Sequence, residues 1–225
     1  MWKSCDLLRK KIGTKQLICG ILGICIAVIW IWSLTAWRMA LVDRKCYELQ
    51  CGIADEVFRF HVLANSDSDE DQKVKLEVRD AVISYMKKEM PDVDSKSEAA
   101  SAQATKQWSE QHLKELTQVA DQVLEQNGMN YQAYTQVTKC YFPEKYYGDI
   151  TFPKGEYEAL RITLGEAKGH NWWCVLYPNL CFLDATYAVV NEEGKDELKG
   201  VLTDDEYQMI TDDKELKVKW FFFGD

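Results

Sequence analysis

Residues 55–71 read DEVFRFHVLANSDSDED, and this stretch decides how the folded part of the chain begins. The run from Asp55 to Leu63 is rich in β-branched and aromatic residues, which predicts a strand. The polar residues from Ala64 to Asp71 combine side chains that cap helices with acids that suit the positive end of a helix dipole. The stretch therefore predicts a strand that leads directly into a helix.

The sequence after Asp71 has the apolar spacing of amphipathic helices. The first helix is expected to end before Pro91, and a capping-box pattern of Ser95 and Glu98 opens a second one. Asn127-Gly128 is a typical end for this second helix. The stripe of the first helix consists of Val74, Val78, Ala81, Val82 and Tyr85.

From Tyr131 onward the pattern changes to strands, predicted over residues 131–142, 157–164 and 172–177. A second capping box, Thr203 to Glu206, predicts a short helix over 204–210, and residues 217–223 are predicted to form a last strand. This order lacks the regular alternation that builds a parallel sheet. It predicts an α+β domain with two main helices packed on a mainly antiparallel sheet.

A long apolar segment precedes this domain. Between Gln16 and Trp37, 22 consecutive positions carry no charged side chain. As a helix the segment would extend about 33 Å, enough to cross a hydrocarbon core of about 30 Å. A buried core helix is the weaker alternative, because core helices rarely lack charge over such a length.

The charges around this segment predict its orientation and the organisation of the chain. Residues 1–15 carry five basic side chains and one acidic side chain, which predicts a cytoplasmic N-terminus. Residues 16–37 are expected to be a transmembrane helix or a signal segment, and the small residues from Ser33 to Ala40 form only a poor cleavage site. We expect residues 38–54 to be a connector and residues 55–225 to be one extracytoplasmic domain.

The exported part is strongly acidic. Of the 27 basic and 36 acidic side chains, five and one respectively lie in residues 1–37, which leaves 22 and 35 and a formal charge of −13. This charge argues against nucleic acid or anionic lipid as the ligand.

Five of the eight cysteines lie beyond the apolar segment, so at least one of them has no partner within the chain. Cys46 and Cys51 can bridge to each other, to a second chain, or to nothing. The spacing of Cys174 and Cys181 is not that of a thiol oxidoreductase. We predict a local disulfide between them, with two buried free thiols as the alternative.

The titratable residues do not form a recognisable catalytic or metal site. Asp67, Asp69 and Asp71 alternate as in a calcium loop, but Gln72 and Val78 stand where that loop needs Gly and Glu. His61 follows Phe60 in the first strand, and no orienting partner or defined nucleophile accompanies it. We therefore predict no catalytic residue, no metal and no cofactor.

Trp172 and Trp173 are adjacent residues of a predicted strand, so their side chains point to opposite faces of the sheet. Burying both requires cover on both faces. The alternative is that one Trp is exposed and anchors a protein partner.

Several segments of the exported part resemble stage II sporulation protein R of endospore-forming Firmicutes. The resemblance extends from about Val57 to Leu183, with a weaker echo over residues 218–223. It is carried by FHVLANSDSD (60–69), RDAV (79–82), FPEKYYG (142–148), PKGEYEAL (153–160), ITLG (162–165) and NWWCVLYPNLCFLD (171–184).

The resemblance implies a signalling ligand, made in the forespore and exported into the space between the forespore and mother cell membranes. There the family activates a membrane-embedded aspartic protease, stage II sporulation protein GA, which processes the precursor of sigma factor E. We expect contact with the partner through Trp172, Trp173, Tyr177, Asn65 and Asp67. Two alternatives remain open, an extracytoplasmic hydrolase that uses His61 and Asp67, and a membrane-tethered structural protein.

Overall fold

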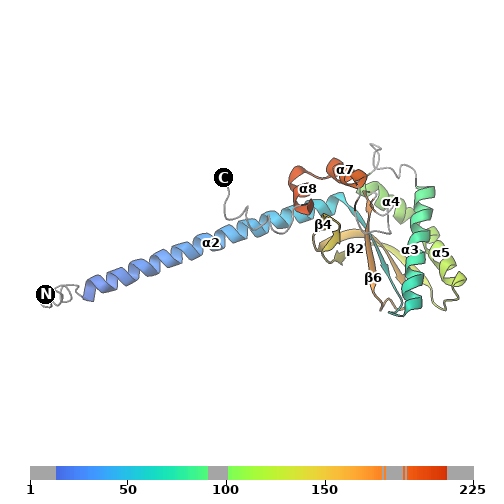
Figure 1. The fold of residues 1–225 in the computed structure, drawn as a ribbon, viewed down its shortest axis with the longest axis horizontal. Helices are drawn as coiled ribbons and strands as arrows, with labels where there is room; N and C mark the ends of the chain where they lie inside the picture. Colours follow the sequence, from blue (N-terminus) through green and yellow to red (C-terminus); the bar gives the residue numbers. More distant parts are fainter. Residues whose placement is uncertain (1–13, 91–100, 179, 181–189, 191, 212–225) are drawn as a thin grey trace. The chain divides into compact units, whose positions relative to one another are not determined.

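The computed structural model describes residues 14–90, 101–178, 180, 190 and 192–211 (Figure 1). The chain divides into two compact units, Met1–Glu48 and Leu49–Asp225. Helix α2, Thr14–Glu56, begins in the first unit and ends in the second.

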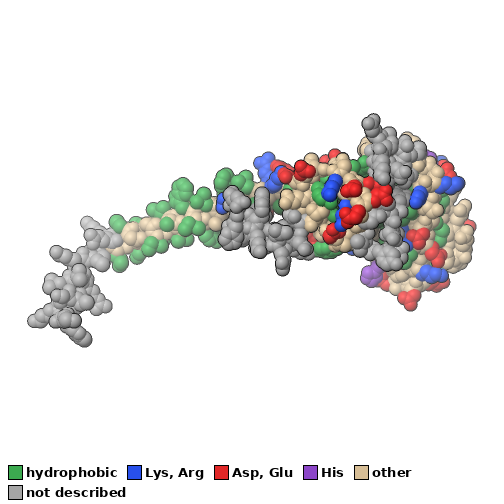
Figure 2. Space-filling model, turned by 45° about the horizontal axis from the view of Figure 1, so that its top comes forward, with side chains coloured by type: hydrophobic (Ala, Val, Ile, Leu, Met, Phe, Trp, Pro, Cys, Tyr) green, Lys and Arg blue, Asp and Glu red, His purple; other side chains and the backbone are tan. Residues whose placement is uncertain are grey.

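Helix α2 is the one helix of the described residues that is long and apolar enough to cross a membrane. Its apolar side chains are largely exposed, including that of Trp32 at 75%. Figure 2 shows these hydrophobic side chains along the visible surface of the helix. A single N-terminal apolar helix of this kind fits a membrane anchor or a signal segment.

The expected connector over residues 38–54 is helical, because α2 continues through it to Glu56. No proline interrupts this stretch, and Gly52 alone does not break the helix. The last turns of α2 are part of the second unit, where Ile53 is fully buried. A Cβ at Gly52 would come within 1.9 Å of Oε1 of Glu206, so helix α8 (Asp204–Thr211) packs closely on this end of α2.

The second unit contains a four-stranded sheet in the order β2-β5-β1-β6. Strand β1 pairs in parallel with β5 and antiparallel with β6, and β2 pairs antiparallel with β5. The prediction of an α+β domain with a mainly antiparallel sheet is confirmed. The strands are β1 (Phe58–Leu63), β2 (Ala133–Phe142), β5 (Gly155–Leu164) and β6 (Asn171–Tyr177).

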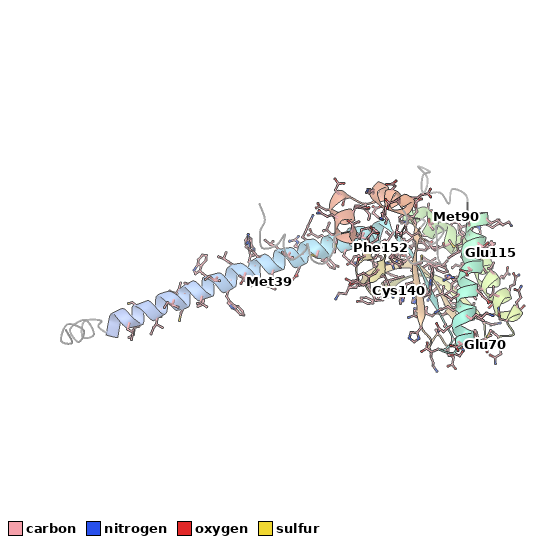
Figure 3. The ribbon with its side chains drawn as sticks, in the orientation of Figure 1. Met39, Glu70, Met90, Glu115, Cys140 and Phe152 are labelled. Carbon is pink, nitrogen blue, oxygen red and sulfur yellow. The ribbon has the colours of Figure 1, made fainter. Side chains whose placement is uncertain are left out.

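Three helices cover one face of this sheet, as Figure 1 shows. They are α3 (Asp69–Glu89), α4 (Ala102–Gln111) and α5 (Leu113–Gln126). Glu70 and Met90 mark the two ends of α3, and Glu115 belongs to α5 (Figure 3). The core on this face contains Phe58, Phe60 and Val62 of β1 against Val74, Val78 and Val82 of α3.

A second core lies on the opposite face, under the end of α2 and a small hairpin. The hairpin consists of β3 (Lys145–Tyr147) and β4 (Ile150–Phe152). Helices α7 (Glu192–Val201) and α8 contribute Leu198 and Ile210. Lys195 of α7 pairs with Asp149 in the turn of the hairpin at 2.8 Å, which fastens this helix to the hairpin.

Arg59 lies in the middle of the second core and is fully buried. Its guanidinium carbon lies 4.4 Å from the ring centre of Phe142, 5.1 Å from Phe152 and 5.0 Å from Tyr157. Cys140 and Phe152, labelled in Figure 3, belong to this side of the sheet. The alternation of β1 thus directs its phenylalanines to one core and its arginine to the other.

The predicted second helix is two helices, because a break at His112 separates α4 from α5. Its predicted cap, Ser95, lies outside the described residues, and α4 begins after the cap Ser101. The capping box at Thr203 and Glu206 is confirmed, with the Thr203 backbone N–H donating to the Glu206 carboxylate at 2.9 Å. The predicted strand over 217–223 also lies outside the described residues.

We predict that Ile53→Ala lowers the free energy of unfolding by about 2–4 kcal/mol, because it removes buried methyl groups at the end of α2. Leu76→Ala is the control, since Leu76 is 38% exposed and its truncation should cost much less. Urea unfolding of the full chain in detergent micelles, followed by near-ultraviolet circular dichroism, measures both. Equal losses for the two variants would show that the end of α2 does not belong to the core.

Candidate functional site

The end of β1 and the start of α3 form a dense polar cluster with the loop between β5 and β6. We call it the polar corner and define it as residues 65–71, 165–170, Gln72, Lys75 and Tyr131. Ser68 caps α3, and Asp69, Glu70 and Asp71 occupy its first turn, as the sequence predicts. These acids suit the positive end of the helix dipole.

Asn65 joins the two loops of the polar corner. Its Nδ2 donates to Oδ2 of Asp71 at 2.9 Å, and its Oδ1 accepts from the backbone N–H of Glu166 at 2.9 Å. Its carbonyl oxygen accepts from the backbone N–H of Lys168 at 3.0 Å. All these bonds lie within the chain, so the observed contacts of Asn65 are structural.

Two glycines permit this close approach of the loops. A Cβ at Gly165 would lie 2.3 Å from Oδ1 of Asn65, and Gly165 has a positive φ of 54°. A Cβ at Gly169 would lie 2.0 Å from the carbonyl oxygen of Ser66, a backbone atom that cannot easily move aside. Glycine is therefore required at Gly169 by space and at Gly165 by both space and conformation.

Asp67 contacts His170, a residue that the sequence analysis did not single out. Oδ1 of Asp67 accepts from the His170 backbone N–H at 2.6 Å and also contacts Nδ1 of its ring. Hydrogen bonds from His170 hold the pKa of the Asp67 carboxyl below its usual value. Both side chains are largely exposed, so this pair is the part of the polar corner most open to a partner.

Asp71 and Lys75 lie beneath this pair and are buried. Burial raises the pKa of Asp71, but hydrogen bonds from Ser66, Tyr131 and Asn65 more than offset it, so the pKa is lowered. Nζ of Lys75 donates to Oε1 of Gln72 at 2.5 Å and to the carbonyl oxygen of His170 at 3.1 Å. Hydrogen bonds within the domain thus account for the observed contacts of both charged groups.

Trp172 and Trp173 point to opposite faces of the sheet, as predicted. Trp172 meets Phe60 edge to face at 5.7 Å, and the Arg79 guanidinium lies 5.0 Å from its ring centre. Trp173 stacks on His61 at 3.7 Å and meets Phe142 at 4.7 Å. Both indoles are half-buried, so each contributes to packing and still presents part of its surface.

The other predicted site residues of this region lie in the interior or outside the described residues. Tyr177 is buried in the helix-side core, which leaves its expected contact with a partner as a prediction. Cys174 is buried in the same core, whereas Cys181 lies outside the described residues. Their predicted pairing therefore also remains a prediction.

His61 and Asp67 do not form a common site. The His61 ring packs between aromatic residues of the second core, whereas Asp67 contacts His170 and Gln72. Burial, with Arg161 and Arg59 nearby, lowers the pKa of His61 to about 3. The imidazole is therefore neutral at physiological pH, and its contacts do not supply the orienting carboxylate of a catalytic base.

Cys46 and Cys51 are free, and both lie in α2. Five residues of helix separate their Cα atoms by about 7.5 Å along the axis, which is beyond the reach of a disulfide. Of the alternatives for these cysteines, a bridge to each other is thus excluded by the helix. A disulfide to a second chain and a free thiol both remain as alternatives.

Comparison with known proteins places the matched part of the chain beyond the apolar segment. The family model for stage II sporulation protein R (spore_II_R) matches residues 54–187. The stage II sporulation protein R of Bacillus subtilis (strain 168) is 42% identical over 149 residues. This alignment covers 65% of the chain and 64% of that relative, so the chain matches less than two thirds of the relative's length. No solved structure matches the chain.

We predict that Gly169→Ala lowers the free energy of unfolding by about 1–3 kcal/mol, because the new methyl group would push against the Ser66 backbone. Gly200→Ala is the matched control, since a Cβ there meets no atom within 4 Å and alanine favours the α7 helix. Urea unfolding curves measure the free energy of unfolding of both variants. A Gly169→Ala domain as stable as the Gly200→Ala domain would contradict the close packing of the polar corner.

Proposed function

Because the chain belongs to the stage II sporulation protein R family, which places it in sporulation, we propose that its folded domain is an extracytoplasmic signalling ligand. Its receptor would be the membrane-embedded aspartic protease, stage II sporulation protein GA, that processes the sigma factor E precursor. The observation that carries the proposal is the position of the family match, which begins at residue 54, beyond the apolar part of α2. The basic residues 1–15 favour export of the domain on the far side of the apolar segment.

The chemistry of the domain supports a binding role. The family description names a sporulation protein and no enzymatic activity. His61 and Asp67, which a hydrolase would need in one site, belong to separate sets of contacts. The polar corner uses its charged groups to hold two loops together. A rigid domain with preset surface loops is what a protein ligand requires.

A ligand activates a protease only if it binds the active state more tightly than the inactive state. A tenfold preference corresponds to about 1.4 kcal/mol of differential binding free energy. The domain would supply this difference from the space between the forespore and mother cell membranes, without chemistry of its own. A tethered structural protein would instead be supported by disulfide-linked dimers through Cys46 or Cys51, which a non-reducing gel would reveal.

We predict that the side of the membrane, and not the apolar segment, determines activity. Residues 49–225 fused to an unrelated cleavable secretory signal should trigger precursor processing when expressed with the protease, whereas the same fragment kept in the cytoplasm should not. The fragment begins at Leu49 and not at Ala54, because Ile53 is buried and Gln50 lies against Gly155. Precursor cleavage on an immunoblot is the measurement. Equal cleavage by the cytoplasmic form would refute the ligand interpretation.

We also predict that Cys174 and Cys181 form a disulfide in the exported protein. Cys19, Cys25, Cys46, Cys51 and Cys140 are free, so none of them competes with Cys181 for Cys174, which supports this pairing. Closing a loop of eight residues stabilises the fold by about 2.5 kcal/mol. Mass mapping of peptides from protein isolated without reductant should show the pair, and finding both thiols free would contradict it.

A further inference from the structure

Four polar and aromatic residues form a row across the sheet, on the face away from α3, α4 and α5. Gln136 of β2 lies opposite Arg161 of β5, and Arg161 lies opposite His61 of β1. His61 in turn lies opposite Trp173 of β6. Residues opposite each other in paired strands point to the same face, so the four side chains are neighbours. We call Gln136, Arg161, His61 and Trp173 the polar row.

The polar row lies at the boundary between the second core and solvent. The next row on one side contains Ala159, Arg59 and Val175, which are fully buried. On the other side, Tyr134 is 61% exposed. Gln136, Arg161 and Trp173 are each half-buried. Part of the row is therefore accessible to a partner and is supported by packed side chains, whereas the ring nitrogens of His61 and Nε of Arg161 are buried.

His61 carries the clearest sign of a missing ligand. It is only 4% exposed, and neither ring nitrogen has a hydrogen-bond partner among the described residues. The Asn171 side-chain amide is close enough to oppose the lowering of the His61 pKa. It makes no hydrogen bond of normal geometry to the ring, however. A neutral imidazole offers one N–H donor and one acceptor. A buried polar group without a partner destabilises the fold, because it has lost its hydrogen bonds to water and gained none in return.

Arg161, next to His61, is also incompletely satisfied. Its Nε is buried without a hydrogen-bond partner, and no carboxylate within the described residues forms an ion pair with it. Nζ of Lys145 lies 5.9 Å from the Trp173 ring centre and adds a second positive charge at the end of the row. Unpaired cations are unexpected here, because the exported part carries a formal charge of −13. A ligand that supplies negative charge would complete the row.

We propose that the polar row binds an acidic, extended segment of a partner protein. One carboxylate of the segment pairs with Arg161 and accepts the N–H of His61, while Lys145 attracts a second acidic side chain. Strands lie about 4.8 Å apart, so the row spans about 14 Å, the length of about four extended residues. The identification of the partner as the protease rests on the proposed function. The preference of the site for an acidic segment does not rest on it.

The first test measures precursor processing by the full chain expressed with the protease. Arg161→Glu should reduce processing about tenfold, and Arg161→Lys should retain part of it because the charge is kept. Lys139→Glu is the control, since Lys139 is exposed on the opposite face of the same sheet and the charge change is the same. Urea unfolding should show that all three variants are folded. If Arg161→Glu processes as well as Lys139→Glu, the site is refuted and the proposed function stands.

The second test needs no protease and uses the three histidines of the chain as probes. The full chain, with 13C at histidine Cε1, is titrated in detergent micelles with a capped tetraglutamate peptide, capped tetraglutamine or acetate. The His61 resonance should shift and saturate with tetraglutamate alone, and should stay unchanged in Arg161→Gln. No shift, or an equal shift with acetate at the same carboxylate concentration, would overturn an acidic-segment site. A saturable shift together with no processing by the wild type would refute the proposed function and leave the site.

Discussion

The guanidinium of Arg59 is a full positive charge inside the second core, and the packing on that side of the sheet depends on how the charge is accommodated. Removing such an ion from water costs several kcal/mol, and none of the ion pairs within the described residues includes it. The faces of Phe142, Phe152 and Tyr157 provide negative potential in place of a carboxylate. Nε donates to the Cys174 carbonyl at 3.0 Å and Nη2 to the Tyr147 hydroxyl at 3.2 Å. One side chain of β1 thus contacts residues of β2, β5, β6 and both strands of the hairpin.

This arrangement also determines the protonation state of His61, which lies two residues further along β1. Phe142, which covers Arg59, lies 5.7 Å from the His61 ring, and Trp173 stacks on that ring at 3.7 Å. The same layer of aromatic side chains therefore surrounds the cation and excludes water from the imidazole. Burial, with Arg161 and Arg59 as neighbouring charges, keeps His61 neutral. The neutral, unsatisfied imidazole of the polar row is a consequence of how the core holds its buried charge.

Local patterns in the sequence predicted part of the fold, but they could not predict which distant residues meet. The β-branched and aromatic composition of residues 55–63 predicted β1, and the capping residues around Ser68 predicted the start of α3, because such signals act over a few residues. The three-residue hairpin strands were missed, since they are too short to show a period. Helix α2 was expected to end where hydrophobicity falls, although nothing there breaks a helix.

The meeting of His61 and Arg161 requires the parallel pairing of β1 and β5, which are about 100 residues apart and carry no local sign of it. Long-range register, and not residue type, was the missing information.

The two polar regions of the domain differ in what a partner could gain from them. In the polar corner, Asn65 and Asp71 already have hydrogen-bond partners within the chain, so a partner would exchange one hydrogen bond for another. In the polar row, the His61 nitrogens and Nε of Arg161 have none among the described residues, so the free domain carries a cost that a ligand with a suitable acceptor reduces. That cost of about 1–3 kcal/mol per group is as large as the roughly 1.4 kcal/mol of a tenfold preference between two receptor states. Binding energy for a switch is therefore available where the fold leaves its own polar groups unsatisfied.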